Sequence, residues 1–423
     1  MSKIHFLGIA FMLVLSTSMY SQVLELQTCL DSAETHMPLL DGKDFLANLL
    51  QNKIKAYNRS YLPIVTINGQ GSYQSAVPEL PFALPGTPGL EIPQAQYRAY
   101  AEFYQPLFDA GAAKSAKETE LAETEVNLFT LQVNAFEFKR QVAQLFFQLL
   151  YLKRQQEIVE KSLSLMRSRE LSLEAALEQG VVQRNDMLKL QSAILSQQQK
   201  LEELQSAYQS GSEVLELLTG INTRDLTLEL PVTFETSVYS TADNPHLKLF
   251  QIRQNSLMAR EDVLKTRRMP RISAFGQAGI GAPNPYNFFE PDLSSYYIVG
   301  VRANWTLWDW GRTSLERKNL HITSEILHSQ QEQKRLEIES NVTRLISTHQ
   351  RLLKSLDYDT EQLELRTQIR QNAESQLTHG VITTNEYLEE VLSEQVAALT
   401  KSLDEISLHQ TRVFLQFETG LLH

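Results

Sequence analysis

The chain has 423 residues, of which 42% are hydrophobic and 21% charged, and its formal net charge is −11. An acidic chain without a concentrated basic face is not expected to bind nucleic acid. A single cysteine, Cys29, excludes an internal disulfide and a cysteine cluster for zinc. With only 14 prolines and 17 glycines, the composition favours long helices over a catalytic α/β fold rich in glycine loops.

Residues 1–21 have the pattern of a secretory signal peptide. Lys3 gives a positive start, residues 4–15 are nearly all apolar, and small polar residues follow as far as Ser21. This apolar run is shorter than the ~20 residues that span a bilayer. We therefore expect an exported protein whose mature form begins near Gln22. Cys29 lies on an apolar helix face and is interpreted as a packing residue.

The rest of the chain is a tandem duplication. Leu-Phe-Asp-Ala-Gly at 107–111 returns 200 residues later as Leu-Trp-Asp-Trp-Gly at 307–311. Gly180, Val181 and the pair Thr219-Gly220 also recur after 200 residues, and a second block recurs after 207. The order of these matches along the chain indicates two copies of a unit of about 200 residues.

Each copy is expected to contain the same elements in the same order: a helix, two strands and a long helical hairpin. In the first repeat, 22–220, these are a helical stretch at 23–57, strands at about 62–74 and 96–108, and a hairpin at 112–218. A linker or equatorial segment at 221–243 leads to the second repeat, 244–423. There we expect a helix at 244–267, strands at about 270–281 and 296–308, and a hairpin at 312–418.

The long helix of each hairpin has about 68 residues and would reach about 100 Å. In the first copy, the two shorter helices together have nearly the same length, so they can stack end to end along the long one. This geometry predicts antiparallel coiled-coil hairpins. The fold class is therefore mainly α with some β.

The predicted strands alternate between apolar and polar residues. Tyr97, Ala99 and Ala101 alternate with Arg98 and Glu102, and residues 297–306 repeat this pattern. One face of the sheet would be apolar and the other would carry charge, as in a membrane barrel, although a half-buried sheet of a soluble domain alternates identically. Four strands leave two open edges, which hydrocarbon does not tolerate, so several subunits would have to share one barrel.

All three tryptophans, Trp305, Trp308 and Trp310, fall at the end of the fourth predicted strand. Indole rings favour the headgroup region of a bilayer, so we interpret the cluster as an interfacial belt in contact with membrane lipid. Core packing is the alternative interpretation.

The double repeat, the strand exits at 107–111 and 307–311, the Gly-Val hairpin turns and the closing Thr-Gly pairs together resemble the TolC family of outer membrane factors. The resemblance covers essentially the whole mature chain. It implies a homotrimer in which four strands per subunit form one 12-stranded outer membrane β-barrel, continued by a periplasmic α-helical barrel. It also implies an exit duct that works with a periplasmic adaptor protein and an inner-membrane pump, such as an RND or ABC transporter.

The resemblance also assigns candidate site residues. Glu386 and Glu389 match the acidic residues that narrow the periplasmic entrance of such ducts, and Asp186 is the first-copy counterpart of Glu386. Carboxylates gathered around a trimer axis would attract cations and raise one another's pKa values. Ile382 stands where the family often has a basic residue.

The hairpin tips, Gly180 with Val181 and Gly380 with Val381, are the expected docking points for the adaptor. In both tips, the glycine permits the tight reversal of the chain. The alternative is that these residues only form the turns.

No catalytic motif, metal site or cofactor site is predicted, because the histidines are widely separated and no nucleophile elbow occurs. A second interpretation therefore stays open, that of an exported coiled-coil structural or scaffold protein without a membrane barrel.

Overall fold

The computed structural model describes residues 22–77, 92–179, 182–223, 226–231, 240–287 and 290–422. The predicted signal peptide lies outside these ranges. The first-repeat elements are β1 (Gln22–Leu24), α1 (Leu26–His36), the 3-10 helix η1 (Pro38–Asp41), α2 (Gly42–Arg59), β2 (Ile64–Tyr73), β3 (Ala95–Phe108), α3 (Ala112–Glu178) and α4 (Arg184–Thr219). They are followed by β4 (Leu226–Leu228), α5 (Pro245–Thr266), β5 (Arg271–Ala282), β6 (Ser294–Asn304), α6 (Arg312–Thr378) and α7 (Thr384–Thr419).

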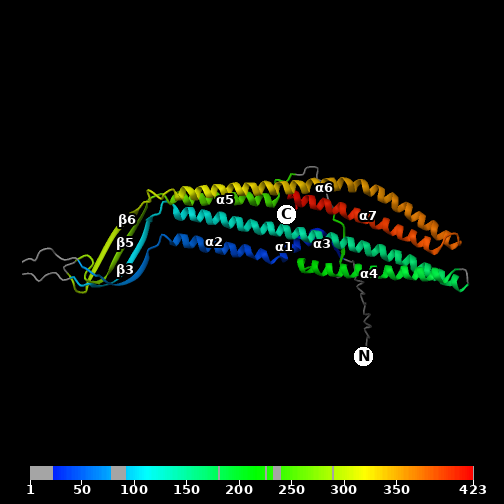
Figure 1. The fold of residues 1–423 in the computed structure, drawn as a ribbon, viewed down its shortest axis with the longest axis horizontal. Coiled ribbons are helices and arrows are strands. Elements are labelled where there is room, and N and C mark those ends of the chain that lie inside the picture. Colours follow the sequence, from blue (N-terminus) through cyan, green and yellow to red (C-terminus); the bar gives the residue numbers. More distant parts are fainter. Residues whose placement is uncertain are drawn as a thin grey trace, which may run out of the picture.

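The molecule is elongated, with the four-stranded sheet at one end and the turns of two helical hairpins at the other (Figure 1). Helices α2 and α4 pack along the long α3, and α5 and α7 pack along the long α6. The long helix α3 also packs against α5 and α7, so the two repeats form one body. The expected pairing of two shorter helices with each long one is therefore present in both copies.

The helical stretch expected at 23–57 is divided. Residues 22–24 form β1, which pairs in parallel with β4, and the helix that follows ends at His36. Pro38 explains this break, because a proline disfavours helical backbone at the residue before it. Met37 is accordingly extended, with φ −75° and ψ 110°, and a short 3-10 turn begins at Pro38.

Both long helices begin at the repeated Leu-x-Asp-x-Gly segment. The carboxylate of Asp109 accepts hydrogen bonds from the backbone N–H groups of Gly111 and Ala113, at 2.9 and 2.8 Å. Asp309 binds Gly311 and Thr313 in the same way, at 3.0 and 3.1 Å. These bonds satisfy N–H groups that have no partner within the helix, so the duplicated aspartates fix the helix starts.

The sheet has the strand order β2-β3-β5-β6, and every neighbouring pair is antiparallel. β2 and β6 are its two open edges. The fourth strand was expected to reach residue 308, but β6 ends at Asn304. The three tryptophans therefore lie in the segment that leads from β6 to α6.

The two larger hydrophobic clusters of the described residues hold the helices together, and a smaller third one lies between α5, α6 and α7. The first joins α1, α3, α4 and α7 near the middle of the molecule and contains fully buried Cys29, Phe146 and Phe417. The second joins both hairpins near their turns and contains Met166, Leu190 and Tyr387. None of the helices in the described ranges has the length and apolar content needed to cross a membrane.

Candidate functional site

The two faces of the sheet differ completely in charge. All four charged residues of the described strands β2, β3, β5 and β6 lie on one face: Arg98, Glu102, Arg271 and Arg302. The opposite face carries exposed apolar side chains, including Ile67, Tyr97, Tyr297, Val299 and Val301. The alternation predicted from the sequence is therefore continuous across all four strands, because directly paired residues point to the same side.

The tryptophans follow the end of β6 and are exposed, at 59% for Trp305, 73% for Trp308 and 86% for Trp310. The indole N–H of Trp305 donates to the carbonyl of Arg268 at 3.0 Å. Trp308 and Trp310 contact each other edge to face, with ring centroids 5.9 Å apart. In the single chain these rings are therefore not part of a core, and Trp305 is hydrogen-bonded through its indole N–H.

The second hairpin turn is built around Gly380, whose φ is +70°. The backbone N–H of Val381 donates to the carbonyl of Gln376 at 2.9 Å, and that of Gly380 donates to Leu377 at 3.0 Å, which is the Schellman arrangement. The Val381 side chain is 71% exposed, whereas Ile382 packs onto the core shared by the hairpins. Gly180 and Val181 of the first turn lie outside the described residues.

The predicted entrance acids lie just after the turns. Glu386 and Glu389 are exposed near the start of α7, and Asp186 is half-buried near the start of α4. Glu386 forms a capping box, because its carboxylate accepts from the backbone N–H and hydroxyl of Thr383 at 2.7 and 2.9 Å. These hydrogen bonds lower the pKa of Glu386 within one chain, which is opposite in direction to the rise expected from a carboxylate ring.

A buried ion pair connects the two helices of the second hairpin. The Arg370 guanidinium Nε lies 2.7 Å from the Glu394 carboxylate, and both side chains are less than 10% exposed. Glu394 also accepts from the Thr367 hydroxyl at 3.0 Å, and its carboxylate lies 3.8 Å from the Lys161 ammonium on α3. This network therefore fixes α6 to α7 and reaches the first hairpin.

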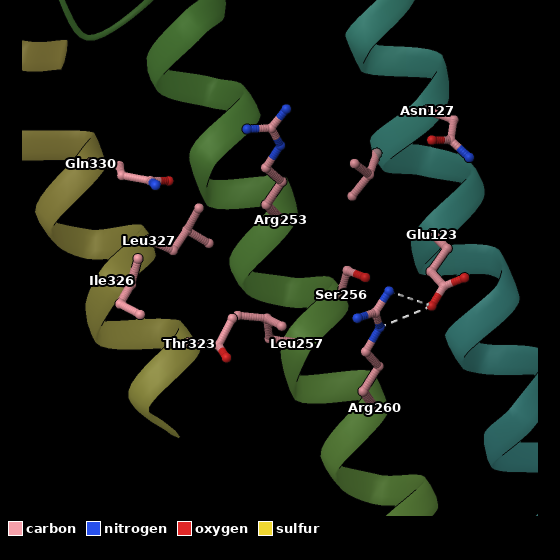
Figure 2. A pocket seen from close by; sticks show the side chains of 11 residues that line it. Glu123, Asn127, Arg253, Ser256, Leu257, Arg260, Thr323, Ile326, Leu327 and Gln330 are labelled. Carbon is pink, nitrogen blue, oxygen red and sulfur yellow. Dashed lines mark hydrogen bonds and ion pairs between the residues drawn. The ribbon is translucent and has the colours of Figure 1, made fainter. Parts of the chain in front are cut away.

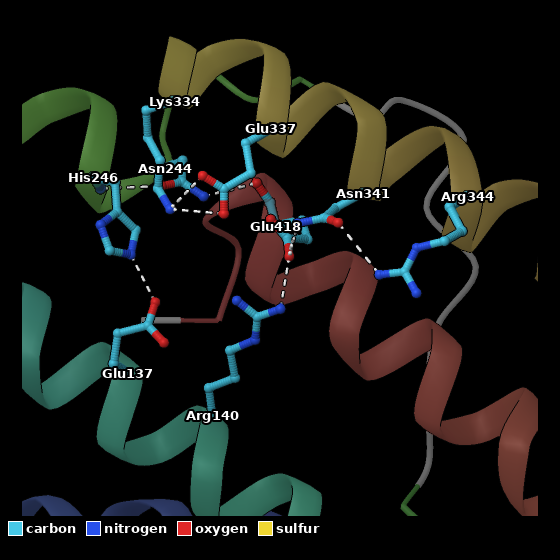
Figure 3. Close-up of polar contacts among 9 residues, drawn as sticks. All are labelled: Glu137, Arg140, Asn244, His246, Lys334, Glu337, Asn341, Arg344 and Glu418. Atoms are coloured by element: carbon cyan, nitrogen blue, oxygen red, sulfur yellow. Dashed lines mark hydrogen bonds and ion pairs between the residues drawn. The ribbon is translucent and has the colours of Figure 1, made fainter. Parts of the chain in front are cut away.

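A second polar cluster lies at the junction of the two repeats (Figure 3). The Glu418 carboxylate is 2.9 Å from Arg140 of α3, and the Glu418 carbonyl accepts from the side chain of Asn244, which caps α5. Burial raises the pKa of Glu418. The adjacent His246 ring lies 2.7 Å from the Glu137 carboxylate and lowers the pKa of that group by hydrogen bonding.

A groove of about 420 Å³ lies between α3, α5 and α6 (Figure 2). The pair Arg260–Glu123 crosses it at 2.9 Å, and Leu257 and Ile326 contribute apolar walls. In the described part of the chain, no three histidine, cysteine, aspartate or glutamate side chains converge to hold a metal ion.

Comparison with known families identifies the architecture. The sequence matches the model of the outer membrane efflux protein family over residues 38–221 and again over residues 239–420. The chain belongs to the outer membrane efflux protein family. The two separate matches confirm the internal repeat. The predicted fold class and the resemblance to the TolC family are confirmed as well.

Solved structures with the same fold are distant in sequence. The outer membrane protein VceC of Vibrio cholerae aligns with a TM-score of 0.69 at 14% identity, covering 93% of this chain and 96% of VceC. The outer membrane channel CmeC of Campylobacter jejuni gives 0.71 at 12%, covering 93% and 85%. CusC gives 0.71 at 15%, covering 93% and 92%. Comparison with curated protein sequences gives no match.

Membership of this efflux protein family makes the chain an outer membrane efflux channel component. Sequence reasoning missed the buried ion pair Arg370–Glu394 and the cluster around Glu418, because both depend on helix register. The sequence could have predicted that Glu386 caps α7, since Thr383-x-x-Glu386 is a capping-box pattern.

Proposed function

We propose that three copies of this chain close their sheets into one 12-stranded barrel in the outer membrane, continued by a periplasmic tube of helices. The observation that carries this proposal is a sheet with two open edges and one uncharged face. Because the four strands alternate in direction, β6 of one copy would run antiparallel to β2 of the next. Closure by threefold rotation would therefore pair the backbone N–H and C=O groups of every edge strand. The uncharged face would then contact lipid.

The assembled tube would serve as the exit duct of a tripartite efflux or type I secretion system. It would pass drugs, metals or other substrates from a periplasmic adaptor and an inner-membrane pump, of the RND or ABC class, to the exterior. Family membership supports this role. The exposed Val381 beside Gly380, with Gly180 and Val181 of the other turn, would dock the adaptor.

Near these turns, Glu386, Glu389 and Asp186 would line the periplasmic entrance. At the other end of the helices, Trp305 and its two neighbouring tryptophans would lie among lipid headgroups. The exposure of Glu386, Glu389 and the tryptophans in the single chain supports both assignments.

Membrane extraction tests the proposal directly. The protein should stay with outer membranes after a carbonate wash, require detergent for release, and run as a trimer that dissociates to monomer on heating. Affinity purification under mild cross-linking should then recover an adaptor and a pump. A monomer released by carbonate would refute the barrel and favour the coiled-coil scaffold.

A further inference from the structure

The charged face of the sheet is strongly unbalanced in sign. It carries three arginines, Arg98, Arg271 and Arg302, against the single acid Glu102, although the whole chain has a net charge of −11. The four-stranded sheet is thus a basic region of an acidic protein. In the proposed barrel, this face would surround the aqueous pore.

Arg98 and Arg302 are held by neutral groups. The Nε of Arg98 donates to the Gln70 side chain at 2.8 Å, and its guanidinium lies 5.6 Å from the Tyr100 ring centroid. The Arg302 guanidinium lies 4.8 Å from the Phe275 ring centroid. Within the described ranges, neither arginine forms an ion pair with a carboxylate. Hydrogen bonds to an amide and contacts with aromatic rings orient a guanidinium without neutralising its charge.

These charges lie at separate levels of the sheet. Arg98 pairs with Gly281, Glu102 pairs with Gln277, and Arg302 pairs with Ser273. Successive levels are therefore four residues apart along β5, which is about 13 Å at the usual rise of a strand. The backbone of Glu102 lies about 13 Å from either positive level, and among the described residues its carboxylate forms no ion pair with Arg98 or Arg302. It therefore compensates neither level fully.

We propose that the barrel interior is an anion-binding region, with Arg98 and Arg302 as its principal sites and multivalent anionic solutes as its ligands. This inference rests on the proposed barrel, in which each arginine level would occur three times. A 12-stranded barrel is about 25 Å across at usual strand spacing and tilt. Side chains reaching inward would bring three guanidinium groups near a solute on the axis, where low-dielectric walls strengthen their attraction.

Binding of a trisulfonated pyrene dye to the purified trimer tests the inference, with fluorescence anisotropy as the readout. The wild type should bind the dye saturably, and added salt should weaken binding. Arg98→Gln with Arg302→Gln should bind about tenfold more weakly or worse, the change that follows a loss of about 1.4 kcal/mol. Arg98→Lys with Arg302→Lys should stay close to wild type, because both positive charges remain.

The matched control is Arg154→Gln with Arg335→Gln, which removes two arginines from the helices. Both are exposed and paired, Arg154 with Glu157 at 2.9 Å and Arg335 with Glu332 at 3.7 Å. This control should leave dye binding unchanged. Equal dye binding by the Arg98/Arg302 glutamine variant and the wild type would overturn the inference, and so would an equal loss in the control.

A trimer gel run on every sample separates the two proposals. Intact, heat-modifiable trimers that do not bind the dye would refute the anion site alone. Failure of the wild type to form a trimer would refute the proposed barrel and the anion site together.

Discussion

The buried ion pair between Arg370 and Glu394 should dominate the stability of the second hairpin near its turn. Its two side chains are 9% and 6% exposed, so solvent screens the pair very little. In Arg370→Met, the Glu394 carboxylate would keep the Thr367 hydroxyl at 3.0 Å, but its nearest cation would be Lys161 at 3.8 Å. Removing one partner of a buried pair typically costs about 3–5 kcal/mol.

Hydrogen exchange measured by mass spectrometry on the full-length trimer would report this loss locally. A cost of about 3–5 kcal/mol corresponds to exchange that is about 10²- to 5 × 10³-fold faster in peptides covering residues 366–394. Peptides from the distant α5 should not change. The double variant Arg370→Met with Glu394→Leu should recover most of the protection, because replacing a buried pair by apolar groups is often neutral.

A matched control lies one turn away on α6. Arg366 pairs with Glu390 at 3.4 Å, but these side chains are 38% and 31% exposed. Exposed pairs contribute at most about 1 kcal/mol, so Arg366→Met should accelerate exchange by less than about fivefold. Exchange in Arg370→Met that is as slow as in this control would refute the expected role of the buried pair, and so would a double variant as unprotected as the single one.

Three further outcomes are expected. Glu386→Ala with Glu389→Ala should weaken the block of bilayer conductance by divalent cations, and an unchanged block would remove the entrance assignment. Cys29, which is fully buried and has its pKa raised to about 12, should resist maleimide until the protein is unfolded in SDS, whereas rapid native labelling would contradict its packing role. The hydrogen bond to His246 lowers the pKa of Glu137 below its ordinary value of 4.5. The stability that the Glu137 carboxylate gives the folded protein should therefore be complete above pH 4.5 and decline as the pH falls below it. In Glu137→Gln, the temperature at which the trimer dissociates should fall less steeply as the pH drops below 4.5. An unchanged fall would assign the pH dependence to other groups.

Local and periodic signals in the sequence predicted most of the fold. The absence of proline and glycine from residues 112–179 and 312–379 predicted the long helices, which the structure ends one residue earlier, at Glu178 and Thr378. The alternation around Arg98 and Arg302 predicted which strand face carries charge. Both signals were readable because helix and strand periods repeat over many residues.

Features that depend on distant pairing were not predictable from the sequence. The strand β1 has three residues and exists through its pairing with β4, about 200 residues later in the chain. The pair Arg370–Glu394 requires the register of two antiparallel helices, which no local pattern specifies. The end of β6 at Asn304 was missed because the apolar alternation continues to Trp305 while the ladder with β5 stops.

The two hairpin turns have diverged where the entrance is proposed. In the second copy, Thr383 and Glu386 form a complete capping box at the start of α7. At the equivalent position of the first copy, Gln183 precedes α4 and makes no side-chain cap. Duplication alone would have preserved the same cap in both turns. At the second turn, the capping box fixes the backbone and orients one of the proposed entrance carboxylates, and the start of α4 lacks such a cap.

This double use of Glu386 changes how substitutions there should be interpreted. Alanine removes both the negative charge and the acceptor for the Thr383 N–H, so a change in conductance could arise from a frayed helix start. Glutamine removes only the charge, because its side-chain oxygen can still complete a capping box. Cation block that falls equally in Glu386→Gln and Glu386→Ala would assign the effect to charge. Block that falls only in the alanine variant would assign it to the geometry of the turn.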